Sequence, residues 1–394
     1  MTHRPAPRPD TPRYLTEERL EIQQLARQFA RERVRPLADE LDSEQGLIPD
    51  SLRDEMGRLG FFGLMIDEEH GGFGLGVFEY CLVAEELAQG WLSVSSLLAR
   101  GNGMGGEFNK QQRKELLPRM AAGDYLGAFA LSEAEAGSDV ANLSCRAVRD
   151  GDEWVVHGTK MWCTYADQAD YLVLFARTVE RDPDKPHRGI TAFIVDKPRG
   201  SFPDGLTGTK IRKIGYHGWN TWELSFDGLR LPAGSVLGEE GRGFYLALGG
   251  LEVGRAHTAA RAIGLAQAAL DDAVAYAGTR RQFGGPLTQF QDVRFKLARM
   301  AADIEAARQL MYHVATEIDS GRRCDRQAAM AKYVASEMAE RVTSDALQIH
   351  GGAGYTTDFA VERHWRDARL TKIFEGASEI QLRVISDDML GVTA

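Results

Sequence analysis

Glu375 is the carboxylate with the clearest setting for acid–base chemistry in this chain. It is the second residue of the sequence FEGASEIQ at 374–381, between an aromatic residue and a glycine and ahead of a helical pattern. Taken by itself, such a carboxylate is more typical of a solvated acid at a helix N-terminus, where the helix dipole favours a negative charge. In a closed apolar pocket the same carboxylate could act as a general base, because burial raises its pKa and makes it a better proton acceptor.

Four further segments combine residue types that could hold a cofactor. They contain, in turn, a run of small and hydroxyl-bearing residues, a tryptophan close to a threonine, arginines beside paired glycines, and glycines after a histidine: 129–139, 158–164, 280–291 and 348–355. An indole can cover a flat ring system, a guanidinium binds phosphate oxygens in pairs, and glycines let a ligand approach the backbone. Each segment also has a purely structural interpretation as a polar loop, a core tryptophan or a basic corner.

Composition argues against several classes of function. The 394 residues carry a net charge of −10, whereas nucleic-acid binding needs a concentrated positive surface. Apolar runs end well before the length that spans a bilayer, and the N-terminal segment MTHRPAPRPD lacks the apolar core of a signal peptide. The four cysteines form no CxxC pair and the nine histidines no HxxxH or HxH pair. We therefore expect no metal site and a reducing, cytoplasmic location.

Helices, then strands, then helices are the elements expected to position these residues. Apolar residues at helical spacing predict helices that include 16–29, 78–98, 111–122, 244–278, 291–320 and 324–350, with Thr16 as the N-cap of the first. Short runs rich in β-branched and aromatic residues predict strands at 154–157, 171–178, 190–195 and 222–226. We expect an α+β chain in four parts: a disordered lead-in over 1–13, a helical domain over 14–128, a β domain over 129–240 and a helical domain over 241–394.

The order and content of these segments resemble the acyl-CoA dehydrogenase family across nearly the whole chain. Residues 129–139 and 158–164 match the family signatures LTEPxAGSD and GxKxWIT/S, and residues 280–291 match RxxFGxPLxxFQ. Residues 374–381 match YEGTxxIQ, the segment of the catalytic base. The resemblance implies an N-terminal helical domain, a middle antiparallel β-barrel or sandwich and a C-terminal four-helix bundle. Departures from the signatures are mild: Ser132, Ala134, Phe374 and Ala377.

The resemblance also implies a role for each matching residue. Glu375 becomes the base that removes the substrate α-proton. FAD would contact residues from all the matching segments: Phe129, Leu131, Ser132, Trp162, Thr164, Arg280, Phe283, Gln291, Gln348, Gly351, Gly352, Ala377 and Glu379. The acyl-CoA substrate would contact a smaller set: Ser138, Glu252, Arg255 and Gly376. In the family, the segment equivalent to 280–291 comes from a neighbouring subunit, which implies an FAD site shared between subunits.

The implied reaction is α,β-dehydrogenation of an acyl-CoA thioester to a trans-2-enoyl-CoA. In the family, a backbone N–H of the base residue and a flavin hydroxyl polarise the thioester carbonyl, the base removes the α-proton, and FAD takes the β-hydrogen as hydride. The resemblance further implies a homotetramer, electron-transfer flavoprotein as the electron acceptor, and a role in fatty-acid or amino-acid catabolism.

Several alternatives compete with this interpretation. Some family members carry the base on a helix immediately before an arginine, but that position is Gly254 here and glycine cannot accept a proton. An acyl-CoA oxidase or another flavin enzyme of the same fold would share most of the motifs. The chain is short for the larger oxidases, and flavin monooxygenases of this fold generally lack the glutamate. A non-catalytic acyl-CoA- or flavin-binding scaffold would be expected to have lost these motifs.

Segment 213–223 departs from the family pattern. Relatives commonly have arginine at the position of His217 and a small polar residue at that of Trp219. Trp219 and Trp222 would either shape the flavin surroundings or the substrate entrance, or belong to the core of the β domain. The pattern is similar to that of dehydrogenases of branched short-chain dicarboxyl thioesters such as methylsuccinyl-CoA.

Overall fold

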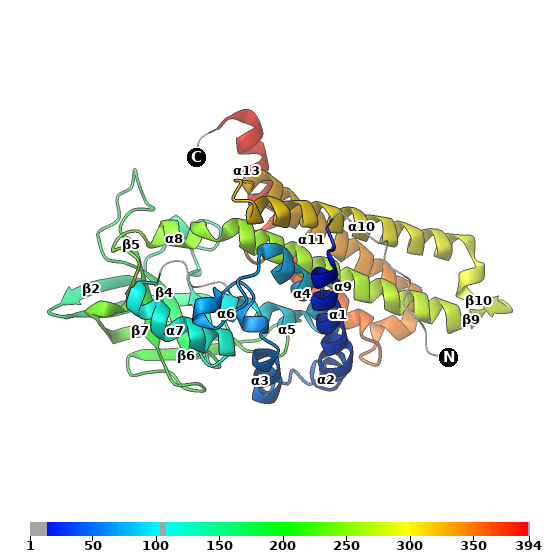
Figure 1. Ribbon diagram of the computed structural model, residues 1–394, viewed down its shortest axis with the longest axis horizontal. Coiled ribbons are helices and arrows are strands. Elements are labelled where there is room, and N and C mark those ends of the chain that lie inside the picture. The colour runs from blue at the N-terminus through cyan, green and yellow to red at the C-terminus, as the bar shows by residue number, and fades with distance from the viewer. Residues whose placement is uncertain (1–13, 103–107, 393–394) are drawn as a thin grey trace.

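The computed structural model describes residues 14–102 and 108–392. Helices, a β-sheet and a second group of helices follow one another along the chain (Figure 1), which confirms the expected α+β order. The lead-in expected over 1–13 lies outside the described residues.

The first group of helices is organised around one buried helix, α4. Nearly all residues of α4 are buried, and it packs against α1 and against α9 of the last group. As predicted, Thr16 caps α1, because its Oγ1 accepts a hydrogen bond from Arg19 N at 3.3 Å. The helices are α1 (Glu17–Phe29), α2 (Arg35–Leu41), α3 (Asp50–Arg58), α4 (Val77–Gly90), α5 (Leu92–Leu97), α6 (Ala99–Asn102) and α7 (Lys110–Ala122). A π-helical turn, η1 (Ala30–Val34), joins α1 to α2.

The single helix predicted over 78–98 is wrong, because Trp91 interrupts it. Trp91 has an extended backbone, with φ −160°, and separates α4 from α5. Gly90 packs so closely on η1 that an added Cβ would lie 2.8 Å from the Val34 side chain. The glycine permits this approach but favours the end of the helix, which the apolar pattern did not reveal.

The middle strands form one sheet in the order β6-β7-β3-β2-β4-β5-β8, with β1 paired to β4 outside this path. Pairing is antiparallel except at β1–β4 and β2–β4, which are parallel. The predicted runs fall on β3, β4, β5 and β7, which confirms a mainly antiparallel β region. The strands are β1 (Gly127–Ala130), β2 (Arg146–Asp150), β3 (Glu153–Thr164), β4 (Tyr171–Arg177), β5 (Ile190–Asp196), β6 (Leu206–Ile211), β7 (Thr221–Pro232) and β8 (Val236–Leu237).

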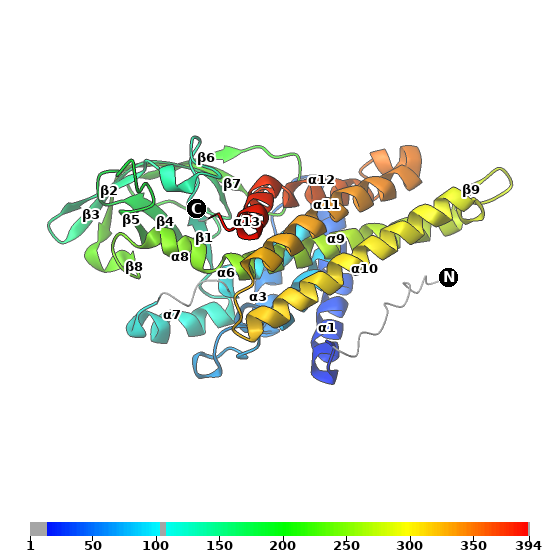
Figure 2. The same cartoon turned by 90° about the horizontal axis from the view of Figure 1, so that it is seen from above.

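The last group contains three long helices that pack lengthwise, α9, α10 and α11 (Figure 2). Gly264 lets α9 touch α4, since an added Cβ would lie 2.1 Å from Glu85 O. The helix predicted over 244–278 is divided at Gly249 and Gly250, two poor helix formers, into α8 and α9. The elements are α8 (Gly243–Gly249), α9 (Leu251–Thr279), α10 (Gln291–Asp319), α11 (Asp325–His350), η7 (Gly351–Tyr355), α12 (Val361–Thr371) and α13 (Ser378–Leu390).

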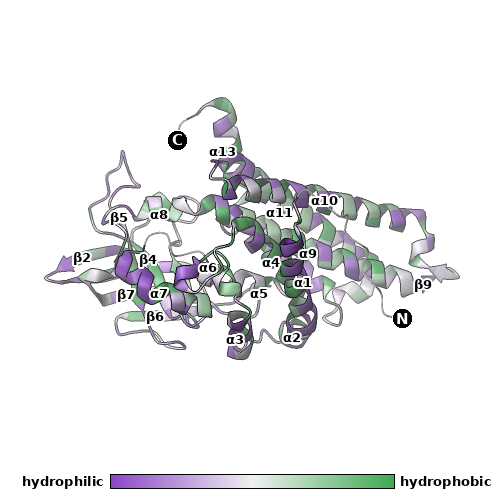
Figure 3. Cartoon of the chain, viewed as in Figure 1, coloured by the Kyte–Doolittle hydropathy of each residue, from purple (hydrophilic) through white to green (hydrophobic). Residues whose placement is uncertain are grey.

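A small hairpin connects α9 to α10 at the end of the molecule opposite the sheet (Figure 1). Its two strands are β9 (Arg281–Gln282) and β10 (Gly285–Pro286). Hydrophilic and hydrophobic residues alternate along α10 and α11 (Figure 3), as expected of helices with one packed and one solvated face. None of the helices in the described ranges combines the length and the apolar content that a bilayer crossing requires.

A buried network around Asp42 joins the three parts of the chain. Asp42 follows α2 and is 1% exposed; it pairs with Arg366 of α12 and accepts a hydrogen bond from Trp91 Nε1 at 3.3 Å. His217, between β6 and β7, lies 3.6 Å from the Asp42 carboxylate through its Nδ1. Burial raises the pKa of Asp42, but the hydrogen bond from His217 and the charge of Arg366 outweigh it and lower the pKa to about 2.

We expect Asp42→Asn to lower the free energy of unfolding by about 2–4 kcal/mol, because it removes a buried counter-ion from Arg366, whose remaining ion-pair partner among the described residues is Glu362. The contribution of Asp42 is fully present above its unfolded pKa of 3.8 and is lost as the pH falls through about 2. Chemical denaturation at neutral pH and at pH values within this acid range measures the difference. Glu55→Gln, which breaks the exposed pair with Arg33, is the control and should cost at most about 1 kcal/mol. Equal losses in both variants would contradict the prediction.

Candidate active site

The loop that carries Glu375 lies between α12 and α13 and is held by a buried lysine. Glu375 has a left-handed backbone with φ 53°, and Gly376 follows at φ 89°. Lys332 of α11, 1% exposed, donates from Nζ to Phe374 O at 2.8 Å and to Gly376 O. Burial outweighs the attraction of Glu375 and lowers the pKa of Lys332 to about 8. One ammonium group therefore fixes the carbonyls on both sides of Glu375 and is still charged at neutral pH.

The Glu375 side chain reaches from this loop to α9. Its Oε2 accepts hydrogen bonds from Thr258 Oγ1 and from Arg261 Nη2, both at 2.6 Å. Arg261 is 1% exposed, and its Nη1 donates to Ser96 Oγ at 2.7 Å. The Glu375 side chain itself is 41% exposed, so it is tethered on one side and open on the other.

The electrostatic setting of Glu375 favours the ionised form. Burial raises its pKa, but the charge of Arg261 and the hydrogen bonds from Arg261 and Thr258 outweigh burial and lower the pKa to about 2. His257 is stacked on Tyr80 with ring centroids 4.5 Å apart, and burial holds its pKa well below the usual value. The imidazole is therefore neutral at pH 7, and Arg261 is the cation that acts on Glu375.

Four residues around Glu375 were missed by the sequence analysis: His257, Thr258, Arg261 and Lys332. The first three lie within the alanine-rich part of α9, where all residues from 255 to 270 are buried. A polar residue inside such an apolar helical run was the available signal, because buried polar groups need a partner. Lys332, in an equally apolar part of α11, carried the same signal.

A β-bulge in β3 presents an exposed indole beside β1. The pairing of β3 with β7 shifts register between Lys160 and Cys163, and Trp162, with φ 62°, is 59% exposed. Phe129 on β1 is 41% exposed. Thr164 lies at the end of β3, and its hydroxyl is 2.9 Å from that of Thr221.

Two hydrogen bonds attach the segment that follows β1 to strand β3. Met161 N donates to Ser132 O at 2.8 Å, and Lys160 Nζ donates to Leu131 O at 2.9 Å. The structure therefore brings together five of the predicted cofactor residues: Phe129, Leu131, Ser132, Trp162 and Thr164. Ser138, predicted to contact substrate, is exposed farther along the same segment.

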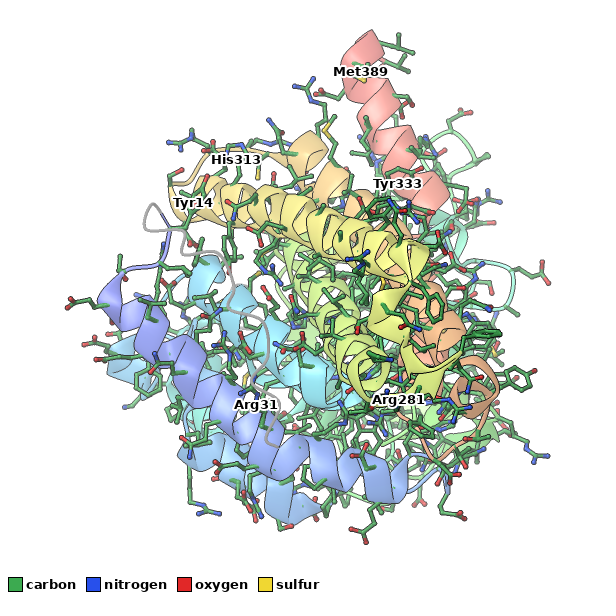
Figure 4. All side chains as sticks on the ribbon, turned by 90° about the vertical axis from the view of Figure 1, so that its right-hand side faces the viewer. Tyr14, Arg31, Arg281, His313, Tyr333 and Met389 are labelled. Atoms are coloured by element: carbon green, nitrogen blue, oxygen red, sulfur yellow. The ribbon has the colours of Figure 1, made fainter. Side chains whose placement is uncertain are left out.

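The remaining cofactor candidates from 280–291 and 348–355 lie at the other end of the molecule. Figure 4 looks onto this end and labels Arg281, next to Arg280. Phe283, at the hairpin tip, has φ 48° and is 94% exposed. The other predicted residues here are exposed: Arg280, Gln291, Gln348, Gly351 and Gly352. Figures 1 and 2 place this hairpin far from the sheet, so one chain does not unite it with Trp162.

The predicted substrate residues on α9 make structural contacts. Glu252 Oε1 accepts a hydrogen bond from Cys324 N at 2.7 Å, at the start of α11. Arg255 is 6% exposed, and its Nη1 lies 3.9 Å from the Asp325 carboxylate. Of the predicted residues after Glu375, Gly376 binds Lys332 through its carbonyl, Ala377 is the N-cap of α13, and Glu379 is exposed in its first turn.

The segment with two tryptophans packs inward. Trp219 is 3% exposed and contacts Tyr165 and Tyr216, with ring centroids 5.8 and 5.0 Å away. Trp222 is partly buried and meets Phe202 edge to face at 5.3 Å. Of the two alternatives for Trp219, core packing describes it, and the Tyr216 ring in turn lies 5.8 Å from Phe374, beside Glu375.

The described residues fit a flavin nucleotide. The Phe129 and Trp162 side chains leave apolar ring surface open to water, which a flat aromatic ligand would cover. At the opposite end, a Cβ added at Gly351 or Gly352 would meet no atom within 4 Å, so the backbone there is free for close approach by a ligand. Exposed arginines on the hairpin supply donors suited to phosphate oxygens.

Comparison with known proteins matches this chain in three consecutive parts. The models for the acyl-CoA dehydrogenase N-terminal, middle and C-terminal domains match residues 16–124, 128–229 and 241–390. The acyl-CoA dehydrogenase of Bacillus subtilis (strain 168) is 40% identical, over 96% of this chain and 100% of its own. The (2S)-methylsuccinyl-CoA dehydrogenase of Cereibacter sphaeroides is 42% identical, over 95% of this chain and 70% of its own.

Solved structures agree with these sequence matches. Butyryl-CoA dehydrogenase from Megasphaera elsdenii superposes with a TM-score of 0.89 at 38% identity, and the match covers 95% of this chain and 99% of that one. A chain from work on the electron transferring flavoprotein of Acidaminococcus fermentans superposes with a TM-score of 0.90 at 37% identity, covering 95% and 98%.

Proposed function

This chain belongs to the acyl-CoA dehydrogenase family of FAD-dependent oxidoreductases, and from that premise we propose that it oxidises the α,β bond of a short acyl-CoA thioester, with Glu375 as the base. The observation that carries the proposal is the placement of Glu375. Its backbone is fixed on both sides by Lys332, and its carboxylate is ionised, oriented by Thr258 and open on one side. Relatives named for butyryl-CoA and methylsuccinyl-CoA support a short acyl chain.

Each residue of the candidate site has its own role in the proposed reaction. The carboxylate of Glu375 accepts the α-proton, and Thr258 holds its oxygen in place. Among the described residues, none accepts a hydrogen bond from the backbone N–H of Glu375, so this donor is available to the thioester carbonyl. FAD, when bound, would supply the acceptor for the β-hydrogen, which leaves as hydride. The product is a trans-2-enoyl-CoA.

FAD binding is proposed to require two copies of the chain. The flavin ring would cover Phe129 and Trp162, with Ser132 and Thr164 at its polar edge. Arg280, Phe283 and the glycines of η7 lie too far away in the same chain, so those of a partner copy would bind the nucleotide end. A homotetramer that reduces electron-transfer flavoprotein in the cytoplasm is the assembly that we propose, and the likeness to a chain studied with such a flavoprotein supports this partner.

An anaerobic titration of the purified protein with a panel of straight, branched and dicarboxyl acyl-CoA thioesters tests the function. Loss of the oxidised flavin absorbance with at least one thioester is the expected result. A colourless protein, or a yellow one that no thioester bleaches, would exclude the proposal. Fast reoxidation of the bleached protein by oxygen alone would instead identify an oxidase.

A further inference from the structure

Two arginines near Glu375 carry more positive charge than the described residues neutralise. Arg261 is buried and has one anionic partner, Glu375. Arg100 in α6 lies over the rings of Trp219 and Tyr165, 5.3 and 5.8 Å from their centroids, and no carboxylate in the described ranges forms an ion pair with it. Its Nε is buried without a hydrogen-bond partner. An uncompensated cation in such surroundings is costly, so an anion is missing from this set of side chains.

The two guanidinium groups act on the same side chains. Burial raises the pKa of Tyr80 and of Tyr216, and the charges of both arginines oppose that rise. Burial also lowers the pKa of His257, and the same two charges lower it further. Arg100 and Arg261 therefore both lie near one group of buried side chains next to Glu375.

A series of contacts through three aromatic rings connects these two arginines. The guanidinium of Arg261 lies 4.8 Å from the centroid of the Phe374 ring, which meets the Tyr216 ring at 5.8 Å. Tyr216 contacts Trp219 at 5.0 Å, and Trp219 contacts Arg100. The Nε2 atom of His257 is buried and has no partner among the described residues. The group thus contains two cations, which suit a small anion.

The position of Arg261 limits what the anion can be. It is 1% exposed and its Nη2 is 2.6 Å from the carboxylate proposed to remove the α-proton. The FAD phosphates are already assigned to exposed residues of the hairpin and η7, so they do not account for a charge deficit at a side chain this buried. The anion is therefore expected to be part of the acyl group whose α-carbon Glu375 serves, and a carboxylate pairs with guanidinium groups in two parallel hydrogen bonds.

We propose that the acyl group carries a second carboxylate, which Arg100 and Arg261 bind, and that this carboxylate draws Arg261 away from Glu375. The inference rests on the proposed function and narrows its substrate to dicarboxylyl-CoA thioesters. Without such a substrate, Arg261 neutralises Glu375 and makes it a weak base. With the substrate carboxylate in place, Arg261 is shared, and Glu375 recovers the basicity that proton removal requires.

The test compares thioesters of equal chain length that differ only in a terminal methyl or carboxylate: pentanoyl-CoA with glutaryl-CoA, and 2-methylbutanoyl-CoA with 2-methylsuccinyl-CoA. Rates of anaerobic flavin reduction are measured on the holoenzyme. In at least one pair, the dicarboxylyl member should react about 10- to 100-fold faster at limiting concentration, the range expected for charge-assisted hydrogen bonds. Equal or faster reaction of the methyl member in both pairs would overturn the inference but leave the proposed function standing. Failure of every thioester would overturn both.

Variants separate a carboxylate site from a structural role. In Arg261→Gln, reduction by the dicarboxylyl thioester should slow by about 10- to 100-fold, whereas reduction by its methyl counterpart should become faster, because Glu375 loses its counter-ion. In Arg100→Met, the ratio between the two thioesters should fall toward one. Arg230→Gln, on the exposed face of β7, is the matched control and should keep the wild-type ratio.

Opposite changes for the two thioesters cannot come from a general loss of folding, and flavin content with far-UV circular dichroism verifies that each variant is intact. Equal slowing of both thioesters in Arg261→Gln would show a structural role and overturn the inference. Equal weakening of both in Arg100→Met would show that Arg100 binds a group common to all CoA esters, which would also overturn it.

Discussion

Glu375→Gln should yield a yellow protein that retains FAD and binds acyl-CoA but reduces its flavin about 10²- to 10⁴-fold more slowly, the range expected for loss of a general base. The amide keeps the size of the side chain and can still bind Thr258 and Arg261, yet it cannot accept the α-proton. Stopped-flow absorbance under anaerobic conditions measures the flavin reduction, and perturbation of the flavin spectrum reports acyl-CoA binding.

A control for this variant should change a carboxylate away from the site. Glu180→Gln, on the exposed connection between β4 and β5, makes the same chemical change and should leave the rate of flavin reduction at the wild-type value. Reduction of the Glu375→Gln flavin within threefold of the wild-type rate would remove Glu375 from the proposed mechanism.

Lys332→Met is expected to slow flavin reduction by about 100-fold with little loss of FAD, because misplacement of a reacting group by about 1 Å costs a factor of this size. Lys332 binds the carbonyls of Phe374 and Gly376, and methionine leaves both without that donor. The loop then loses the contact that sets the position of the Glu375 carboxylate. Lys332 is thus a positioning residue.

The kinetic pattern distinguishes positioning from general destabilisation. We expect kcat to fall more than KM rises, and Lys332→Arg, which keeps the donors and the charge, to recover part of kcat. Lys114→Met, on the exposed face of α7, is the control and should behave like the wild type. A Lys332→Met variant with unchanged kcat and a lower melting temperature would show that the lysine serves stability alone.

The elements could be predicted from the sequence where one periodicity ran without interruption. Helices α10 and α11 and strands β4 and β5 begin and end within one or two residues of the predicted runs. The errors lie where a glycine meets a neighbouring element, at Gly90 beside Val34 and at Gly249 and Gly250 before α9. Such breaks depend on tertiary contacts, and hydrophobic spacing along a single helix carries no information about them.

The motifs of the candidate site could be predicted from the sequence, but the side chains that contact those motifs could not. Glu375 and Trp162 stand in segments whose residue types suggest chemistry. Arg261 meets Glu375 from 114 positions away in the chain, and Lys332 meets Phe374 from 42 positions away. Sequence spacing orients side chains within one helix but does not show which distant loop faces that helix. The pairing that limits the basicity of Glu375 therefore became visible only in three dimensions.

Backbone conformation singles out the same residues by a route independent of charge. The non-glycine residues with positive φ in the described ranges are Gln45, Trp162, Tyr165, Tyr216, Phe283 and Glu375. Trp162, Phe283 and Glu375 are predicted site residues, and Tyr165 and Tyr216 pack against Trp219. A residue with a Cβ pays roughly 1–2 kcal/mol in this conformation relative to glycine. Glycine would relieve this cost at Trp162, Phe283 and Glu375, but it would remove the side chains proposed to contact the flavin or to accept the proton. At these three positions the chain therefore gives up some backbone stability for a side chain that the proposed function needs.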